Sequence, residues 1–361
     1  MDDRTTGKRI TIREVAQAAG VSVATVSRVL NGNKYVSEDV LESVRRVIAE
    51  TGYRPSRLAQ TFARGSSRTV TLLYDALDPV SDSGVWSMFA TILSLGLHDV
   101  LSQADYQLRI LHIPPQLHSL QEEDIHSWMI DDARMAEGDP LIITNPLAAD
   151  SLLGFIVQRR HPCVVIGKCA SPLALPQIDP DNLEGARLAT AHLIELGHAD
   201  IAFLCPPVPH TVVQDRYQGF LEAIQLTGGL RVRAWRMETR PSGFAFSYES
   251  ARQRVHEAIL QKQLPTAIVA FNDEMAFGAI QALHAQGMRI PEDISVTGFD
   301  DMPPARMYTP PLTTVRQDIR QLGQHAARSL LRQVQGYPGN SLTLLPVSLV
   351  IRDSTSPPGA E

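Results

Sequence analysis

The chain has 361 residues, 44% of them hydrophobic, and a formal net charge of −6 at pH 7. This length supports two or three compact units. The polar N-terminus resembles no signal peptide and no apolar run could span a bilayer, so we expect a cytoplasmic protein that does not enter membranes. The cysteines, Cys163, Cys169 and Cys205, are odd in number and lack CxxC spacing. We therefore expect buried thiols and no disulfide framework or metal site.

Residues 11–32 have the pattern of two short helices joined by a glycine turn. Thr11 and Glu14 have the spacing of a capping box, in which each side chain satisfies a free backbone donor at a helix start. Gly20 offers the left-handed conformation that ends a helix. The apolar stripe of this first helix is Val15, Ala16 and Ala19.

The second helix is expected to begin at Ser22 and to end at the Asn31-Gly32 pair. Val26, Val29 and Leu30 can face inward, which leaves small residues, hydroxyls and one arginine on the outer face: Val23, Ala24, Thr25, Ser27 and Arg28. A third helix is expected between Ser37 and Gly52. This layout is typical of a helix-turn-helix reader of the DNA major groove, although an ordinary three-helix bundle would have the same pattern.

Charge favours the DNA-binding interpretation. Residues 1–65 hold 11 Lys and Arg against 7 Asp and Glu, a net charge of +4, whereas residues 66–361 carry −10. A basic head on an acidic body is expected of a phosphate-binding module joined to a sensor.

Residues 53–65 complete a resemblance to the lactose-repressor (LacI/GalR) family of transcription factors, in which this segment is a hinge helix that folds at the DNA minor groove. Residues 56–63 are too few for a stable isolated helix, which agrees with that role. Phe62 replaces a family leucine that wedges into the central base step, and a linker aromatic packed on the core is the alternative. The DNA contacts implied by the resemblance are Thr11, Ser22, Val23, Ala24, Thr25, Ser27, Arg28, Asn31, Tyr53, Arg57 and Phe62.

From about residue 68, short β-rich runs alternate with amphipathic helical stretches. The predicted strands include 70–74, 108–113, 141–144, 164–166, 201–205, 267–270 and 294–298. Predicted helices include 185–196, 216–226, 248–260 and 274–286. This alternation indicates parallel sheets covered on both faces, most simply split into two α/β lobes.

The family resemblance continues through residues 195–198, 215–220, 271–279, 290–301 and 311–317. It implies a small all-α helix-turn-helix head and an α/β two-lobed core like the periplasmic binding proteins, with parallel sheets. The expected domains are 1–54 for DNA binding, 55–67 for the hinge and linker, and 68–361 for effector binding and dimerisation. Lobe 1 is expected at about 68–178 and 317–346, and lobe 2 at about 179–316 and 347–361.

The resemblance also implies an effector site, made of Asp75, Arg216, Phe246, Asn272, Asp300 and Gln317. Asn272 and Asp300 are expected to follow strands, and Arg216 to open a helix. Each has an alternative: Asn272 as a turn residue, Arg216 in a salt bridge to Asp215, and Phe246 in the core, with Phe244 or Tyr248 in its place. Asp273 and Asp301 are expected to be helix caps or turn formers. Asp75 departs from the family and could accept hydroxyls or attract a cation.

No nucleophile elbow, HExxH or GxGxxG motif is present, so we expect no catalytic residues and no cofactor. The expected function is a homodimeric regulator, a repressor of transcription, that binds palindromic double-stranded operator DNA. Its operator affinity would change when a small-molecule effector, a sugar, binds. A non-sugar effector, nucleobase-like or cationic, and a DNA-architectural protein without an effector are the alternatives.

Overall fold

The chain divides into two compact units, residues 1–67 and 68–361. A computed structural model describes residues 12–22, 25, 26, 29, 38–51, 68–75, 88–113, 122–132, 135, 138–144, 151–169, 175–207, 210–226, 233–238, 248–337 and 342–359. Expectations for residues 30–37 and for the hinge, residues 55–67, lie outside these ranges.

The N-terminal unit contains α1 (Ile12–Ala18) and α3 (Glu38–Thr51), and Thr25, Val26 and Val29 between them are also helical. Five side chains from these segments form its buried core: Val15, Ala16, Val26, Val44 and Val47. The first helix ends where Gly20 takes a φ of +66°, which allows the Val21 amide to reach back to the carbonyl of Ala16.

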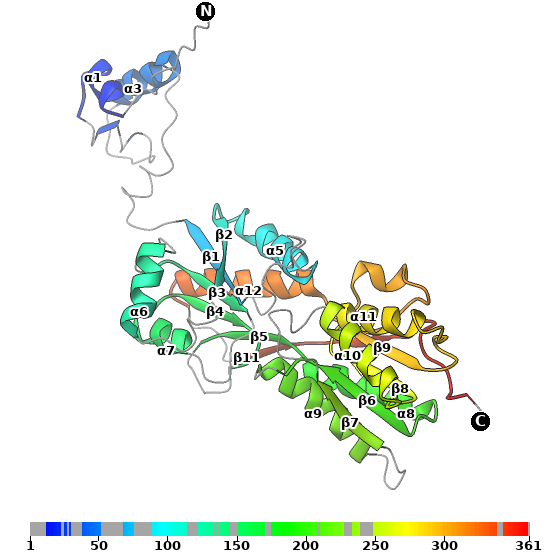
Figure 1. Cartoon of the computed structure of the whole chain (residues 1–361). Coiled ribbons are helices and arrows are strands. Elements are labelled where there is room, and N and C mark those ends of the chain that lie inside the picture. The colour runs from blue at the N-terminus through cyan, green and yellow to red at the C-terminus, as the bar shows by residue number, and fades with distance from the viewer. Residues whose placement is uncertain are drawn as a thin grey trace, which may run out of the picture. The chain divides into compact units, whose positions relative to one another are not determined.

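The first lobe of the larger unit is a six-stranded parallel sheet in the order β11-β5-β4-β3-β1-β2 (Figure 1). Its strands are β1 (Thr69–Asp75), β2 (Gln107–Ile113), β3 (Leu141–Thr144), β4 (Cys163–Ile166), β5 (Gln177–Pro180) and β11 (Leu342–Leu345). Its helices are α5 (Met88–Leu101), α6 (Glu122–Ser127), the π-helical turn η2 (Trp128–Asp132), α7 (Ser151–Gln158) and α12 (Ile319–Val334).

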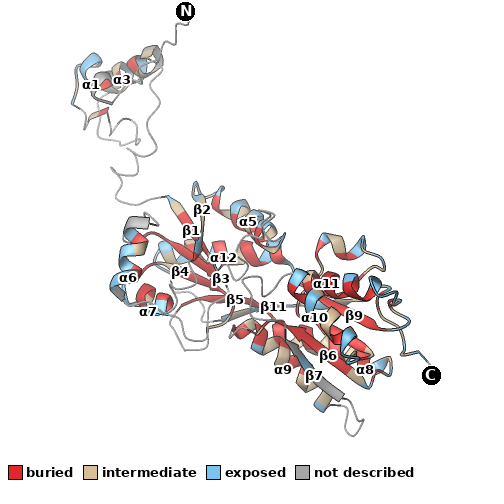
Figure 2. Cartoon of the chain, viewed as in Figure 1, coloured by how far each residue is buried: buried red, intermediate tan, exposed pale blue. Residues whose placement is uncertain are grey.

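Both faces of this sheet are covered, as parallel strands require. Leu72 of β1 packs with α5 and α12, whereas its neighbour Leu73 packs with α6 and α7 on the other face. Figure 2 shows the strands as the most buried elements, with the outer helix surfaces exposed.

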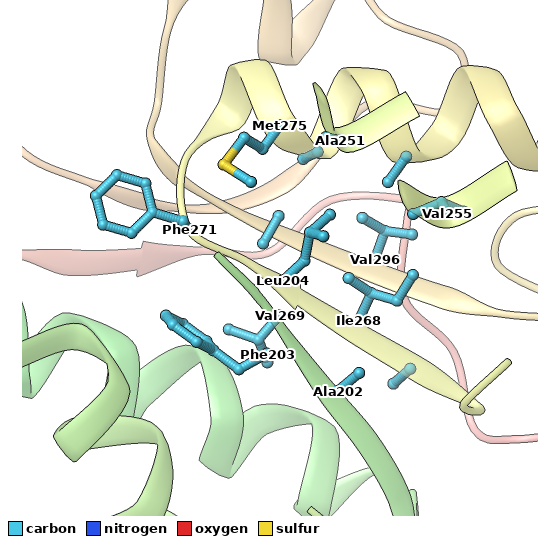
Figure 3. Close-up of a cluster of buried hydrophobic side chains, with 14 of the residues drawn as sticks. Ala202, Phe203, Leu204, Ala251, Val255, Ile268, Val269, Phe271, Met275 and Val296 are labelled. Carbon is cyan, nitrogen blue, oxygen red and sulfur yellow. The ribbon is translucent and has the colours of Figure 1, made fainter. Parts of the chain in front are cut away.

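The second lobe is a six-stranded sheet in the order β12-β10-β9-β8-β6-β7. Its strands are β6 (Asp200–Cys205), β7 (Arg233–Glu238), β8 (Ala267–Ala270), β9 (Ser295–Asp300), β10 (Thr313–Arg316) and β12 (Ser348–Val350). Its helices are α8 (Asn182–Glu195), α9 (Thr211–Gln225), α10 (Tyr248–Leu260), α11 (Asp273–His284) and the 3-10 turn η3 (Pro303–Arg306). Figure 3 shows Phe203 and Val269 on one side of this sheet, with Leu204 and Ile268 on the other beneath α10 and α11.

Within the described ranges, the chain crosses between the lobes three times, at Asp181, at Gln317–Asp318 and at Pro346–Val347. β5 continues in the first sheet to Pro180, two residues beyond the expected boundary near 178. Two residues alone separate β11 from β12, so no crossover helix can turn the chain around. β12 therefore runs antiparallel to β10, as an edge strand of a sheet whose other strand pairs are parallel as expected.

Two helices begin earlier than the sequence indicated. α8 starts at Asn182, because the Asp181 carboxylate accepts a hydrogen bond from the Glu184 amide and caps it. α9 starts at Thr211, so Arg216 lies in its second turn and does not open the helix as expected. Burial of Thr211 and Val213 stabilises this additional turn.

Other expectations concern thiols, metals and membranes. Cys163 and Cys205 are buried as expected, but Cys169 is half-buried because it lies in the loop after β4; none of the three forms a disulfide. Within the described ranges, no cluster of three or more His, Cys, Asp or Glu side chains is suited to hold a metal ion. Likewise, none of the described helices has the length and apolarity to cross a membrane.

Candidate functional site

Arg216 of α9 is the centre of a buried polar cluster in the second lobe. Its side chain is 5% exposed, and its Nη1 donates to the carbonyl oxygen of Phe271 at 2.6 Å. Its Nε donates to Oδ1 of Asn182 at 2.9 Å. Burial lowers the pKa of Arg216 to about 10, and nearby acids, Asp300 first, oppose this effect. The guanidinium therefore stays charged at neutral pH.

Two aromatic rings flank this guanidinium. Its central carbon lies 3.5 Å from the ring centroid of Phe299 and 4.5 Å from that of Phe271. Both distances permit cation–π attraction, which is strong where water is excluded. The arginine is thus held in one orientation by rings, a carbonyl and an amide.

Asp300 and Gln317 meet beside this arginine. Oδ1 of Asp300 lies 3.8 Å from Nη2 of Arg216 and accepts a hydrogen bond from Nε2 of Gln317 at 2.5 Å. Oε1 of Gln317 is buried and has no hydrogen-bond partner among the described residues. Burial raises the pKa of Asp300 to about 6, although Arg216 and Gln317 favour the charged form.

Asp300 is the last residue of β9, where the sequence placed it just after the strand. Its φ of +121° lies in a region that L-residues rarely adopt. Strained backbone of this kind is common at ligand sites, where the surrounding fold maintains it.

Asn272 follows β8 and caps α11, since its Oδ1 accepts a hydrogen bond from the Met275 amide at 2.8 Å. The cap uses the oxygen alone, and the Nδ2 group donates to no described residue. Asn272 is half-buried. Asn272 is thus a helix cap rather than the turn residue that the sequence allowed as an alternative, and its amide group donates to none of the described residues.

The remaining two expected site residues are less completely described. Asp75 ends β1 in the first lobe, where its backbone pairs with Ile113, and its side chain lies outside the described part of the chain. Phe246 also lies outside it, as does Phe244.

The sequence analysis missed Asp179 and Asn182, which extend the cluster to the first lobe crossing. Asn182 donates from Nδ2 to Oδ1 of Asp179 at 3.1 Å and accepts from Arg216 through its own oxygen. Burial raises the pKa of Asp179 to about 7, against the opposing charge of Lys168. Asp179 is the third residue of β5 and Asn182 follows that strand, but β5 has only four residues and was not among the strands predicted.

The neighbouring acids Asp273 and Asp301 have other partners. The buried Asp273 carboxylate accepts from the Met302 amide at 2.7 Å and from the Thr314 hydroxyl at 2.5 Å. Asp301 forms ion pairs with Arg316 at 2.6 Å and with Arg352 at 2.5 Å. The Asp273 contacts join α11 to β10 and to the loop after β9, and the Asp301 ion pairs join that loop to β10 and to the segment after β12.

In the N-terminal unit, Ser22 caps the second helical segment. Its Oγ accepts from the Thr25 amide at 3.1 Å and lies 2.9 Å from the Thr25 hydroxyl. Val26 is fully buried, so Thr25 and not Val26 is accessible for other contacts. The other expected DNA contacts lie outside the described residues: Thr11, Val23, Ala24, Ser27, Arg28, Asn31, Tyr53, Arg57 and Phe62.

Comparison with known proteins identifies both units. Residues 11–56 match the model for bacterial regulatory proteins of the lacI family, and residues 190–355 match a periplasmic binding protein-like domain. The HTH-type transcriptional repressor PurR of Haemophilus influenzae (strain ATCC 51907 / DSM 11121 / KW20 / Rd) is 30% identical over 350 residues, which cover 95% of this chain and 98% of that protein. The chain belongs to the lacI family.

Two further matches cover nearly the whole length of this lacI-family regulator. The ribose operon repressor of Halalkalibacterium halodurans is 33% identical over 353 residues, which cover 96% of this chain and 97% of the repressor. The crystal structure of the lac repressor dimer bound to operator and the anti-inducer ONPF has a TM-score of 0.80 at 29% identity, covering 97% of this chain and 100% of that one. The expected helix-turn-helix head and two-lobed α/β core are confirmed, and the protein is a DNA-binding transcriptional regulator rather than an enzyme.

Proposed function

We propose that this lacI-family regulator is a cytoplasmic repressor that binds a palindromic operator as a homodimer and changes its operator affinity when a sugar binds at Arg216, Asp300 and Gln317. The observation that carries the proposal is the buried Oε1 of Gln317, which has no partner among the described residues. An unsatisfied buried acceptor costs about 1–3 kcal/mol. A ligand hydroxyl donated to this oxygen recovers that free energy.

The polar groups around Gln317 suit a polyhydroxylated ligand. Asp300 supplies carboxylate oxygens as acceptors, Asn272 supplies an amide donor, and Arg216 supplies further donors. Each sugar hydroxyl is both donor and acceptor, so a sugar needs such mixed partners to be buried without unpaired groups.

Charge balance supports a neutral effector over a cationic one. The Arg216 charge lies beside the Asp300 carboxylate, and Lys168 pairs with Asp215 at 2.6 Å. Burial also raises the pKa of Asp179 to about 7, which reduces its negative charge near neutral pH. An additional cation or anion would meet no uncompensated partner among these groups.

The mechanism follows from where the cluster lies in the chain. Gln317 lies in the second lobe crossing, and Arg216 is hydrogen-bonded to Asn182 beside the first, so a ligand that binds Arg216 and Gln317 alters the free energy of moving one lobe against the other. By the family resemblance, lobe movement changes the pairing of the hinge segments, residues 56–63, in the minor groove. Operator affinity then changes without any covalent step.

Titration of the full chain with a panel of aldoses, ketoses and nucleobases tests this proposal. We expect one sugar to raise the Tm by mass action and to shift operator binding in fluorescence anisotropy. Asp300→Asn should lose both responses, whereas Asp105→Asn, which alters an exposed acid, should keep them. Response to nucleobases alone would overturn the sugar assignment, and no response from the panel in either assay would favour a DNA-architectural protein.

A further inference from the structure

Two contacts join the lobes beside the buried polar cluster centred on Arg216, which we call the effector cluster. Nζ of Lys168, in the loop after β4 of the first lobe, lies 2.6 Å from Oδ2 of Asp215 on α9 of the second lobe. The carbonyl oxygen of the same lysine accepts a hydrogen bond from Oγ1 of Thr211 at 2.8 Å, also on α9. One residue of the first lobe thus contacts two successive turns of a second-lobe helix.

The loop that carries Lys168 is fixed to its own sheet. The Gly167 amide donates to the Ile178 carbonyl at 2.9 Å, and the Cys169 amide donates to Oε1 of Gln177 at 2.8 Å. Gly167 has a φ of +113°, which a side chain would disfavour. Since both neighbours of Lys168 are held by β5, its backbone is pre-positioned against α9.

The helix on the other side carries the central residue of the effector cluster. Asp215 directly precedes Arg216, and Thr211 lies in the first turn of the same helix. If the first lobe moves away at this point, either these contacts break or the turn that holds Arg216 moves with it. Lys168 and Asp215 side chains are 25% and 23% exposed, so their attraction is only partly screened by water.

We propose that Lys168, Asp215 and Thr211 form a latch that holds the lobes together in the effector-free protein and so sets the population that is ready to bind effector. The latch consists only of groups of the chain itself. Its existence therefore does not depend on the effector being a sugar, and only its effect on effector affinity rests on the proposed function.

Hydrogen–deuterium exchange on the effector-free full chain tests the latch. We expect Lys168→Met to increase exchange in the peptides that cover residues 163–169 and 210–216, one in each lobe, while the sheet cores stay protected. In wild-type protein, 0.5 M NaCl should cause the same increase in exchange. In the Lys168→Met variant, the salt should cause little further increase. The charge-swapped double variant, Lys168→Asp with Asp215→Lys, should restore protection.

Arg187→Met is the matched control, because the Arg187–Glu184 ion pair has the same length, 2.6 Å, and similar exposure, but lies within α8. If Lys168→Met changes exchange in the first-lobe peptide alone, or no more than Arg187→Met does, the latch proposal is wrong. A thermal unfolding curve for each variant separates lobe opening from a general loss of folding. Failure of a sugar to bind leaves these readouts unaffected, so the two proposals fail independently.

Discussion

Gln317 donates a hydrogen bond from Nε2 to Oδ1 of Asp300 at 2.5 Å, while its own Oε1 has no partner within the described ranges. The two residues belong to different segments, since Asp300 ends β9 and Gln317 lies in the second lobe crossing. A ligand bound to both therefore connects a strand end to the polypeptide that joins the lobes.

Gln317→Met should weaken binding of the sugar identified by titration by roughly five- to 150-fold, the equivalent of about 1–3 kcal/mol. Methionine has a similar length but neither the donor nor the free acceptor. The Tm without ligand should change little, because the variant removes an unsatisfied buried oxygen but also the hydrogen bond that Gln317 donates to Asp300. Calorimetric titration measures the affinity, and an unchanged Kd would remove Gln317 from the site.

The raised pKa of Asp179 should lower the free energy of unfolding as the pH rises. The ordinary aspartate pKa of 3.8 is raised to about 7 for Asp179 in the fold, chiefly by burial. Between these two values the folded state holds a proton that the unfolded state has lost. Between these two pKa values, the free energy of unfolding therefore falls by about 1.4 kcal/mol for each pH unit. Above the folded pKa, Asp179 causes no further decrease.

Asp179→Asn should therefore flatten the pH dependence of Tm between pH 4 and pH 7. Asparagine keeps the oxygen that accepts from Asn182 but cannot ionise. We expect the variant to unfold at a higher temperature than the wild type at pH 8 and at a similar one at pH 4. An equal destabilisation at both pH values would show that Asp179 has no proton-linked effect on folding.

Gly219→Ala should destabilise the second lobe. Gly219 lies where α8 and α9 pack, and a Cβ there would overlap the carbonyl oxygen of Leu183. Relieving this overlap requires α8 and α9 to move apart, which would lower the free energy of unfolding by about 1–3 kcal/mol. This outweighs the roughly 1 kcal/mol that replacing glycine by alanine contributes to the stability of a helix. Gly154→Ala is the control, since no described atom lies within 4 Å of its added Cβ, and it should raise the Tm slightly. Similar Tm changes in both variants would contradict this prediction.

The sequence predicted most of the architecture because strand–helix alternation and buried apolar runs are strong local signals. Ala267–Ala270 and Tyr248–Leu260, for example, have the predicted limits. It missed short strands such as β5, whose four residues include two polar side chains, and with β5 it missed Asn182. The sequence also did not predict that α9 begins at Thr211, because His210 provides no side-chain cap to mark this start.

The candidate site was predicted through family motifs and not through local pattern. Arg216, Asp300 and Gln317 are 84 and 17 residues apart along the chain, and only the fold brings them together. The aromatic partners show the limit of this approach. The sequence named Phe246 as the aromatic that stacks on the effector, which stays a prediction, but it did not indicate that Phe271 and Phe299, each beside a strand end, place their rings against Arg216.

Arg28→Ala should weaken operator binding by roughly five- to 150-fold, because arginine contacts with base edges or phosphates contribute about 1–3 kcal/mol. With an operator obtained by in vitro selection, fluorescence anisotropy at several salt concentrations distinguishes the two kinds of contact. Loss of a phosphate contact lowers the slope of log affinity against log salt by about one, whereas loss of a base contact relaxes sequence preference and leaves that slope nearly unchanged. Arg289→Ala, which removes the same charge from an exposed ion pair in the second lobe, should leave operator affinity unaltered. If Arg28→Ala binds the operator as tightly as Arg289→Ala does, Arg28 is not part of the DNA interface, and Thr25, the half-buried residue beside the Ser22 cap, becomes the candidate to substitute next.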